Sequence, residues 1–251
     1  MIPAFDDFFS LCKESTNDLA STLCNASIKT SFKDDGSIVT NHDIEIEKTI
    51  RDVIKNAFPD HSIIGEELEP HQENESVSWI IDPIDGTLSF CNGSPLFGTL
   101  IGLLENGEPR YGFMRLPMVN DTVVFSDGNL TMVNEKPSSY KVFNGWDNSL
   151  VLTTDINTIL QSPASSFWNI AIENGATART WGDCFGYFMF CSGRADMMTD
   201  TNLKKVDILP VIPILKGVGA SIITFGTNNY QHLMALTPEG YGELRSLTKA
   251  N

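Results

Sequence analysis

The sequence is poor in basic residues. It has 17 Lys and Arg against 32 Asp and Glu, which gives a formal net charge of −15 at pH 7. Proteins that bind nucleic acid need clusters of basic side chains to hold phosphates, so this composition argues against that class. An acidic protein that handles phosphate esters would itself need metal ions to offset the repulsion between like charges.

Several motifs and segments are also missing. No apolar run is long enough to cross a bilayer, and residues 1–7 lack the basic and apolar regions of a signal peptide. The five cysteines are an odd number at scattered spacing, with no Cys-x-x-Cys pair, which favours reduced thiols. No Walker or dinucleotide-binding glycine motif occurs. We therefore expect a cytoplasmic protein without nucleic-acid or membrane partners.

The pattern of apolar residues predicts a layered α/β architecture. The chain has 251 residues, of which 41% are hydrophobic, enough to bury the core of one large domain or two lobes. Apolar residues at helical spacing predict helices in the first part of the chain. Apolar segments separated by turn residues then predict a series of strands, and mixed helices and strands follow. The predicted helices cover residues 5–23, 181–191 and 207–215, with a further helix that starts near Thr40 or Asn41, either of which could cap it, and runs to residue 58. The predicted strands cover residues 61–65, 79–81, 97–104, 108–116, 121–125 and 150–153. Residues 131–148 are weakly patterned, so we expect an α+β lobe over 1–140 and an α/β lobe over 141–251.

The most informative segment is Trp-Ile-Ile-Asp-Pro-Ile-Asp-Gly-Thr, residues 79–87. Its proline excludes a helix interior, so the segment predicts a buried strand that enters a turn with Asp82 and Asp85 at its end. These carboxylates would repel each other unless a cation lay between them, and their hard oxygens suit Mg²⁺. Gly86 lets a ligand approach the backbone, and its amide with that of Thr87 could face an anion. A simple acidic turn is the alternative, but the combination indicates metal-assisted phosphate chemistry.

Four separated segments resemble the magnesium-dependent inositol monophosphatase-like phosphatases, in order and in spacing. They are residues 33–43, 64–67, 82–87 and 206–214. Residues 179–187 and 193–196 look most like the histidinol-phosphatase branch, because Asp183 stands where true inositol phosphatases have smaller, less polar residues. The resemblance covers nearly the whole chain. It implies a layered αβαβα sandwich of the sugar-phosphatase type and a homodimer.

The resemblance also implies a site for two or three Mg²⁺ ions. Asp82 would bridge two ions. Glu66 and the carbonyl of Ile84 would serve the first ion, and Asp85 with Asp207 the second. Two metal ions held in this way can place the attacking water and the leaving oxygen on opposite sides of phosphorus.

The catalytic roles follow from the same resemblance. The nucleophile would be a metal-bound water, oriented and deprotonated by Thr87 and Asp43 with help from Glu66. Asp85 and the amides of Gly86 and Thr87 would contact the phosphate end of the substrate.

The other end of the substrate would face Asp183 and Asp200. In L-histidinol phosphate that end is cationic, so two nearby carboxylates make electrostatic sense. We therefore predict a Mg²⁺-dependent phosphomonoesterase of a small metabolite, with L-histidinol phosphate preferred. The alternatives are an inositol phosphate, another sugar phosphate or a nucleotide 3′-phosphate as substrate, or a non-catalytic metabolite-binding relative.

Each of these residues also has a purely structural interpretation. Asp43 could be a first-turn acid that favours the helix dipole, and Asp207 could cap the helix that follows it. Asp183 could bond a local backbone amide. Trp181 is expected in the core rather than at the substrate, and Lys33 could be a surface charge.

The sequence departs from the family pattern around the last predicted ligand. Val206 stands where the family usually has an aromatic residue, and Lys204 and Lys205 add positive charge beside a proposed cation site. These changes bear on the affinity of the second metal and on substrate preference more than on the fold.

Overall fold

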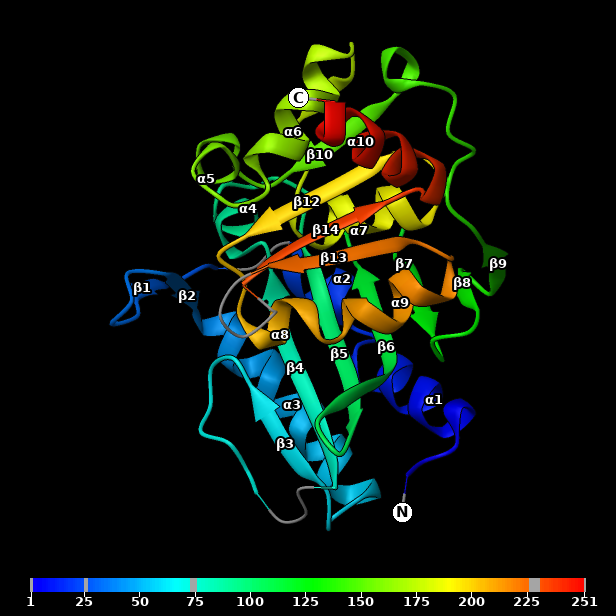
Figure 1. Ribbon diagram of the computed structural model, residues 1–251. Coiled ribbons are helices and arrows are strands. Elements are labelled where there is room, and N and C mark those ends of the chain that lie inside the picture. Colours follow the sequence, from blue (N-terminus) through cyan, green and yellow to red (C-terminus); the bar gives the residue numbers. More distant parts are fainter. Residues whose placement is uncertain (1, 25–26, 73–75, 226–230, 251) are drawn as a thin grey trace.

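The computed structural model describes residues 2–24, 27–72, 76–225 and 231–250 of the chain. Helices and sheets alternate in five layers, with two sheets separated by a central layer of helices (Figure 1). This arrangement confirms the predicted αβαβα sandwich.

The larger sheet lies in the first part of the chain. Its strand order is β3-β4-β5-β6-β7-β8-β9, with β3 parallel to β4 and all other neighbours antiparallel. Short turns that join consecutive strands produce this meander. The bounds are β3 Ser62–Gly65, β4 Val77–Asp85, β5 Gly98–Glu105, β6 Glu108–Leu116, β7 Thr122–Ser126, β8 Thr131–Val133 and β9 Lys136–Ser138.

The smaller sheet has the order β11-β10-β12-β14-β13. Strand β10 is parallel to both of its neighbours, whereas β14 is antiparallel to β12 and β13. A separate hairpin of β1 and β2 projects from one side of the molecule (Figure 1). The bounds are β10 Leu150–Thr153, β11 Thr177–Arg179, β12 Met197–Thr201, β13 Ser221–Phe225, β14 His232–Leu236, β1 Thr30–Phe32 and β2 Ile38–Thr40.

The helices form the three remaining layers. Helices α1 (Phe5–Ser15) and α3 (Asn41–Ala57) cover the outer face of the larger sheet. The central layer contains α7 (Asp183–Cys191), α8 (Lys205–Ile208) and α9 (Val211–Gly217). The smaller sheet is covered by α5 (Ile156–Leu160), α6 (Ser165–Glu173) and α10 (Pro238–Ala250). Shorter pieces are α2 (Leu19–Leu23), α4 (Thr87–Cys91) and the 3₁₀ turn Trp146–Asn148.

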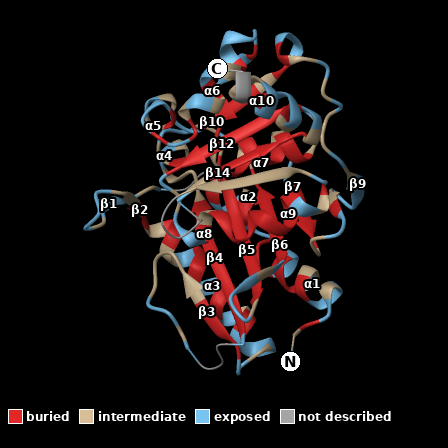
Figure 2. Cartoon of the chain, viewed as in Figure 1, coloured by how far each residue is buried: buried red, intermediate tan, exposed pale blue. Residues whose placement is uncertain are grey.

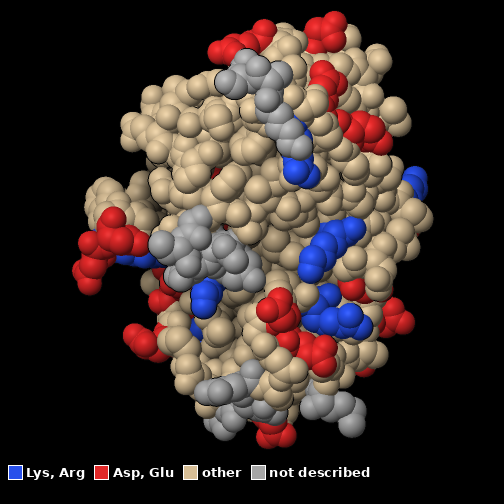
Figure 3. Space-filling view, viewed as in Figure 1, with Lys and Arg blue, Asp and Glu red and all other residues tan. Residues whose placement is uncertain are grey.

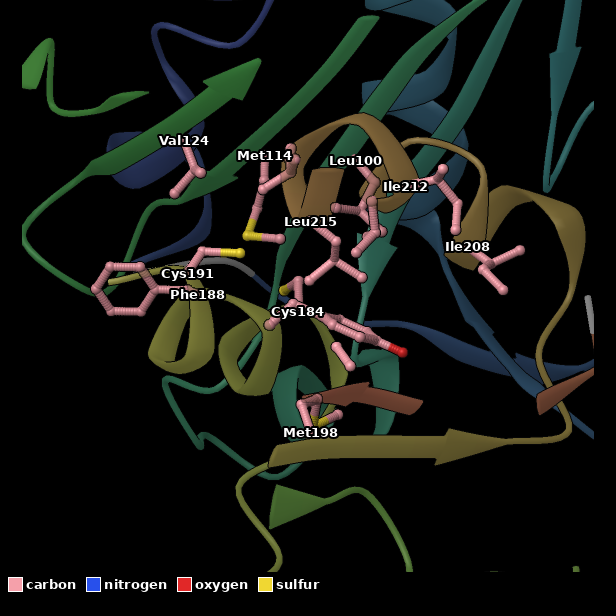
Figure 4. Packing of buried hydrophobic residues seen from close by; sticks show 14 of the residues in the cluster. Leu100, Met114, Val124, Cys184, Phe188, Cys191, Met198, Ile208, Ile212 and Leu215 are labelled. Atoms are coloured by element: carbon pink, nitrogen blue, oxygen red, sulfur yellow. The ribbon is translucent and has the colours of Figure 1, made fainter. Parts of the chain in front are cut away.

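Most strands of the two layered sheets are buried, whereas β13 is only half-buried, as Figure 2 shows. In β4, Ile80 packs into the central layer, whereas Trp79 and Ile81 pack beneath α1 and α3. The alternation follows from the two-residue period of a strand. In the central layer, side chains of the larger sheet such as Leu100 meet Cys184 of α7 and Leu215 of α9 (Figure 4). Three apolar clusters therefore hold the five layers together.

Most predicted elements are present, but several are wrong in extent. The helix predicted over residues 5–23 is two helices, because the hydroxyls of Ser15 and Thr16 bond back to the carbonyl of Cys12 and end α1. The helix predicted over residues 207–215 is also two, α8 and α9, which are separated at Leu209 and Pro210. Strand β4 extends through both aspartates, with a register shift between Asp82 and Asp85.

The described helices include none with the length and apolarity required to cross a membrane. The strands of the larger sheet end at Ser138 and those of the smaller sheet begin at Leu150. A division into lobes at residues 140 and 141 stays a prediction.

Candidate active site

The start of helix α3 fixes the first of the predicted catalytic acids. Thr40 is the N-cap residue, and its hydroxyl accepts hydrogen bonds from the amides of His42 and Asp43. Asp43 Oδ2 in turn accepts from the Thr40 amide at 2.8 Å. Asp43 is therefore the first-turn acid of a capping box. It is also fully buried, and burial is the main reason why its pKa is raised.

The free oxygen of Asp43 faces the turn after β4. The Thr87 hydroxyl lies 3.4 Å from Asp43 Oδ1 and 2.9 Å from the carbonyl oxygen of Ile84. Gly86 precedes Thr87 with φ of +89°, a left-handed conformation that favours glycine, and a Cβ there would lie 2.9 Å from the carbonyl oxygen of Leu96. The structure thus brings together the predicted residues 43, 84, 86 and 87 from distant parts of the chain.

Glu66 follows β3 and is held by cations. Its Oε1 atom lies 2.9 Å from Lys33 Nζ and 3.1 Å from Lys204 Nζ. Burial raises the pKa of Glu66, but the two lysines outweigh burial and the net pKa is lowered. Lys33 also pairs with Glu67 at 2.6 Å, so Lys33 belongs to the site rather than to the open surface. Burial nevertheless raises the pKa of Glu67 to about 7.

Sequence reasoning missed the residues that hold this loop. Glu47 on α3 is fully buried and accepts hydrogen bonds from Arg51 Nε at 2.7 Å and from the Glu67 amide at 2.7 Å. Arg51 donates to the carbonyl oxygens of Leu68 and Glu69. A Cβ on Gly65 would overlap the Glu47 carboxylate. The signal was an acid and an arginine four residues apart on the apolar face of a helix.

Asp82 and Asp85 lie at the end of β4. Asp82 is 2% exposed, and its buried Oδ1 atom has no hydrogen-bond partner among the described residues. Asp85 accepts a hydrogen bond from the amide of Cys184, the second residue of α7. The pKa of both carboxyls is raised well above the ordinary value, first by burial and then by neighbouring acids. The cluster therefore carries more carboxylate than the protein around it neutralises.

Asp207, in the second part of the chain, joins the same group of acids. Asp207 Oδ2 accepts the Lys204 amide at 2.7 Å. Asp207 is the third residue of α8, with Lys204 as the N-cap, so the interpretation of Asp207 as the cap of a following helix is wrong. Its pKa is raised to about 7 by burial, and the Lys204 amide opposes that shift. Asp207, Asp85 and Glu66 also raise the pKa of Asp82, which places all four acids in one electrostatic cluster.

Thr154 connects the two acids predicted to face the substrate. Its hydroxyl donates to Asp200 Oδ2 at 2.9 Å and accepts the amide of Asp183 at 2.8 Å. Burial raises the pKa of Asp183 to about 6, and burial together with Asp183 raises that of Asp200 to about 8. Gly86 is next to this pair, because a Cβ there would lie 3.1 Å from Asp183 Oδ2. Sequence reasoning did not identify Thr154, which carries no motif of its own.

Trp181 corrects one structural expectation. The residue was expected in the core, but it is 38% exposed. It precedes Gly182 and the left-handed Asp183, where the backbone passes so close to Thr154 that a Cβ on Gly182 would overlap it. The chain therefore begins α7 at Asp183, two residues later than predicted, and leaves the indole outside the helix.

The donor set suits a hard divalent cation. The carboxylate oxygens of Glu66, of Asp82 with Asp85, and of Asp207 come from three segments, and the unpartnered Asp82 Oδ1 atom is buried among them. Within the described ranges, no three His, Cys, Asp or Glu side chains are grouped so that they could hold a metal ion in their present positions. Glu66, Asp85 and Asp207 instead bond to lysine or amide groups of the chain.

The five-layer fold is the fold of inositol monophosphatase structures such as those from Zymomonas mobilis and Anabaena. The sequence model of the inositol monophosphatase family matches residues 9–246. The chain belongs to this family, whose members are phosphoric monoester hydrolases and are typically dependent on Mg²⁺.

Three relatives show the range of the family. A histidinol-phosphatase of Chlorobaculum parvum is 32% identical over 193 residues, which cover 77% of this chain and 74% of that protein. A Nus factor SuhB of Vibrio cholerae is 28% identical over 96% of this chain and 93% of its own length. The structure of an inositol monophosphatase from Zymomonas mobilis superposes with a TM-score of 0.79 at 23% identity, over 98% of this chain and 100% of that one. Membership thus establishes the reaction class, whereas the three names differ in function.

Proposed function

We propose that this chain is a Mg²⁺-dependent phosphomonoesterase that hydrolyses L-histidinol phosphate. The observation that carries the proposal is the cluster of buried acids with raised pKa values around the unpartnered Asp82 Oδ1 atom. Raised pKa values within one cluster mark a candidate site for a cation or a reaction. The similarity to the Chlorobaculum parvum histidinol-phosphatase supports the substrate.

The chain would hold Mg²⁺ through side chains from three segments and one backbone carbonyl. These groups are Glu66, Asp82, the carbonyl of Ile84, Asp85 and Asp207. The bound ions would supply positive charge at the phosphate and lower the pKa of a coordinated water.

The remaining residues orient the reacting groups. Thr87 and Asp43 form a hydroxyl–carboxylate pair that can accept and hold a proton from water, and the buried Thr40 bonds keep Asp43 in place. The amides of Gly86 and Thr87 would bind phosphate oxygens.

Asp183 and Asp200 would bind the cationic amine end of the substrate. Burial and then the nearby Asp183 raise the pKa of Asp200, and a cationic ligand would relieve that repulsion. We also propose that the enzyme acts as a homodimer.

A panel of phosphate esters tests this function. Phosphate release would be measured with L-histidinol phosphate, inositol 1-phosphate, fructose 1,6-bisphosphate and a nucleotide 3′-phosphate, with Mg²⁺ and with EDTA. We expect the highest kcat/KM for L-histidinol phosphate and no turnover in EDTA. If histidinol phosphate is among the slowest substrates, the substrate assignment is wrong.

A non-catalytic role is the second candidate. The two lysines that already neutralise Glu66 favour it, because they occupy a carboxylate that a metal ion would use. Such a protein would bind a metabolite in the presence of Mg²⁺ without turnover of any ester in the panel, so the same experiment separates the two functions.

A further inference from the structure

One oxygen atom of the site is shared by two ammonium groups. Glu66 Oε1 lies 3.1 Å from Lys204 Nζ and 2.9 Å from Lys33 Nζ. The Lys204 ammonium also lies 3.2 Å from Asp35 Oδ2 in the loop between β1 and β2. Lys204 therefore joins this loop to the carboxylate that the proposed function assigns to the first metal ion.

We propose that Lys204 is a competitor, built into the chain, for the divalent cation at Glu66. Its ammonium holds the carboxylate oxygen that the cation would use, and so weakens metal binding. The inference rests on the proposed role of Glu66 as a metal ligand. It concerns the strength of that site rather than its existence.

Electrostatics gives the direction of the effect. A divalent ion at Glu66 would lie within a few ångströms of the ammonium, so the ion either displaces the lysine or binds against its repulsion. The Lys204 side chain is 43% exposed and can turn toward water, so the free energy needed to displace it from Glu66 is moderate. The lysine therefore lowers metal affinity without abolishing it.

The backbone of Lys204 has a different role from its side chain. The amide donates to Asp207 Oδ2 at 2.7 Å and so holds another predicted metal ligand. A substitution that keeps the backbone removes the competing charge and leaves this hydrogen bond in place. The proposal can therefore be tested without disturbing Asp207.

The neighbouring Lys205 provides a matched control. It is exposed, and it forms no ion pair within the part of the chain that the structure describes. Replacing Lys205 by Gln changes the net charge by the same amount as replacing Lys204. Any difference between the two variants then reports the contact with Glu66 rather than the overall charge.

Isothermal titration of the full chain with Mn²⁺ tests the proposal. We expect Lys204→Gln to bind Mn²⁺ about tenfold more tightly than the wild type, and Lys205→Gln to bind within about twofold of it. Lys204→Arg, which keeps the charge, should retain the weaker affinity. Thermal unfolding provides a second readout, in which Mn²⁺ should raise the Tm of Lys204→Gln more than that of the wild type.

Two contrary results have different meanings. Equal or weaker Mn²⁺ binding by Lys204→Gln would overturn the competitor role while leaving the metal site intact. An absence of Mn²⁺ binding in the wild type and all three variants would overturn the metal site itself, and with it the proposed function.

Discussion

The acids on the two sides of the site are neutralised in different ways. Glu66 is paired with Lys33 and Lys204, and its pKa is lowered. Asp82 and Asp200 form no ion pair with a lysine or arginine within residues 2–24, 27–72, 76–225 and 231–250, and their pKa values are raised. The first side is stable without a ligand, whereas the second requires protons or an added cation.

This difference indicates which acids of the site would be stabilised by an added cation. The face shown in Figure 3 gives no such information, because its basic side chains lie in separate groups among acidic ones. The distinction arises in the interior, where a low effective dielectric makes each unpaired carboxylate costly. We therefore expect cation binding to act mainly on the β4 end of the cluster.

The largest expected effect comes from removing a charge on the unpaired side. Asp85→Asn should lower kcat/KM by about a thousandfold, because a ligand of the proposed cation contributes several kcal/mol to the stabilisation of the transition state. The variant should remain folded by circular dichroism. The exposed Asp52→Asn is the control, with activity within about twofold of the wild type. Near-parental activity of Asp85→Asn at saturating Mg²⁺ would contradict the proposed site.

A second prediction concerns the buried ion pair between Glu47 and Arg51, which holds the loop that carries Glu66. Glu47→Ala should lower the free energy of unfolding by about 3–5 kcal/mol, because the change leaves Arg51 as an uncompensated buried charge. Urea unfolding measures the loss. Glu45→Ala, on the same helix with a side chain 63% exposed, should change stability by less than about 0.5 kcal/mol. Similar losses in the two variants would show that the buried pair does not anchor the loop at Glu66.

The smallest predicted effect is a dependence of stability on pH. Asp200 has a folded-state pKa of about 8, above its value in the unfolded chain, so the folded state binds the proton more tightly. Its contribution to stability is therefore present at low pH and is lost as the pH rises toward 8. The metal-free protein should lose about 5 °C in Tm between pH 6 and pH 8.5, and Asp200→Asn should lose less. A Tm that rises over this range, or an unchanged slope in the variant, would contradict the raised pKa.

Much of the larger sheet and of the helices on its outer face was predictable from local patterns, whereas β10 was the one strand of the smaller sheet with a predicted range. Helix α3 begins at Asn41 with Thr40 as its cap, one of the two starts that the sequence allowed, because a capping box depends only on residues three positions apart. The helix breaks after Ser15 and at Pro210 were missed, because the apolar spacing continues across them while the backbone hydrogen bonds do not. The exposed position of Trp181 depends on the close approach of the next residue, Gly182, to Thr154, which is distant in the sequence.

For the site, the sequence by itself determined which acids the chain carries and which family it belongs to. The run from Asp82 to Thr87 and the acids at positions 43, 66 and 207 are recognisable from the sequence without any knowledge of their contacts. Only the tertiary structure decided how each carboxylate is neutralised: by lysines at Glu66, by Arg51 at Glu47, and by no described cation at Asp82. The physical reason is that charge and motif are properties of single residues, whereas burial and pairing exist only once distant segments have packed together.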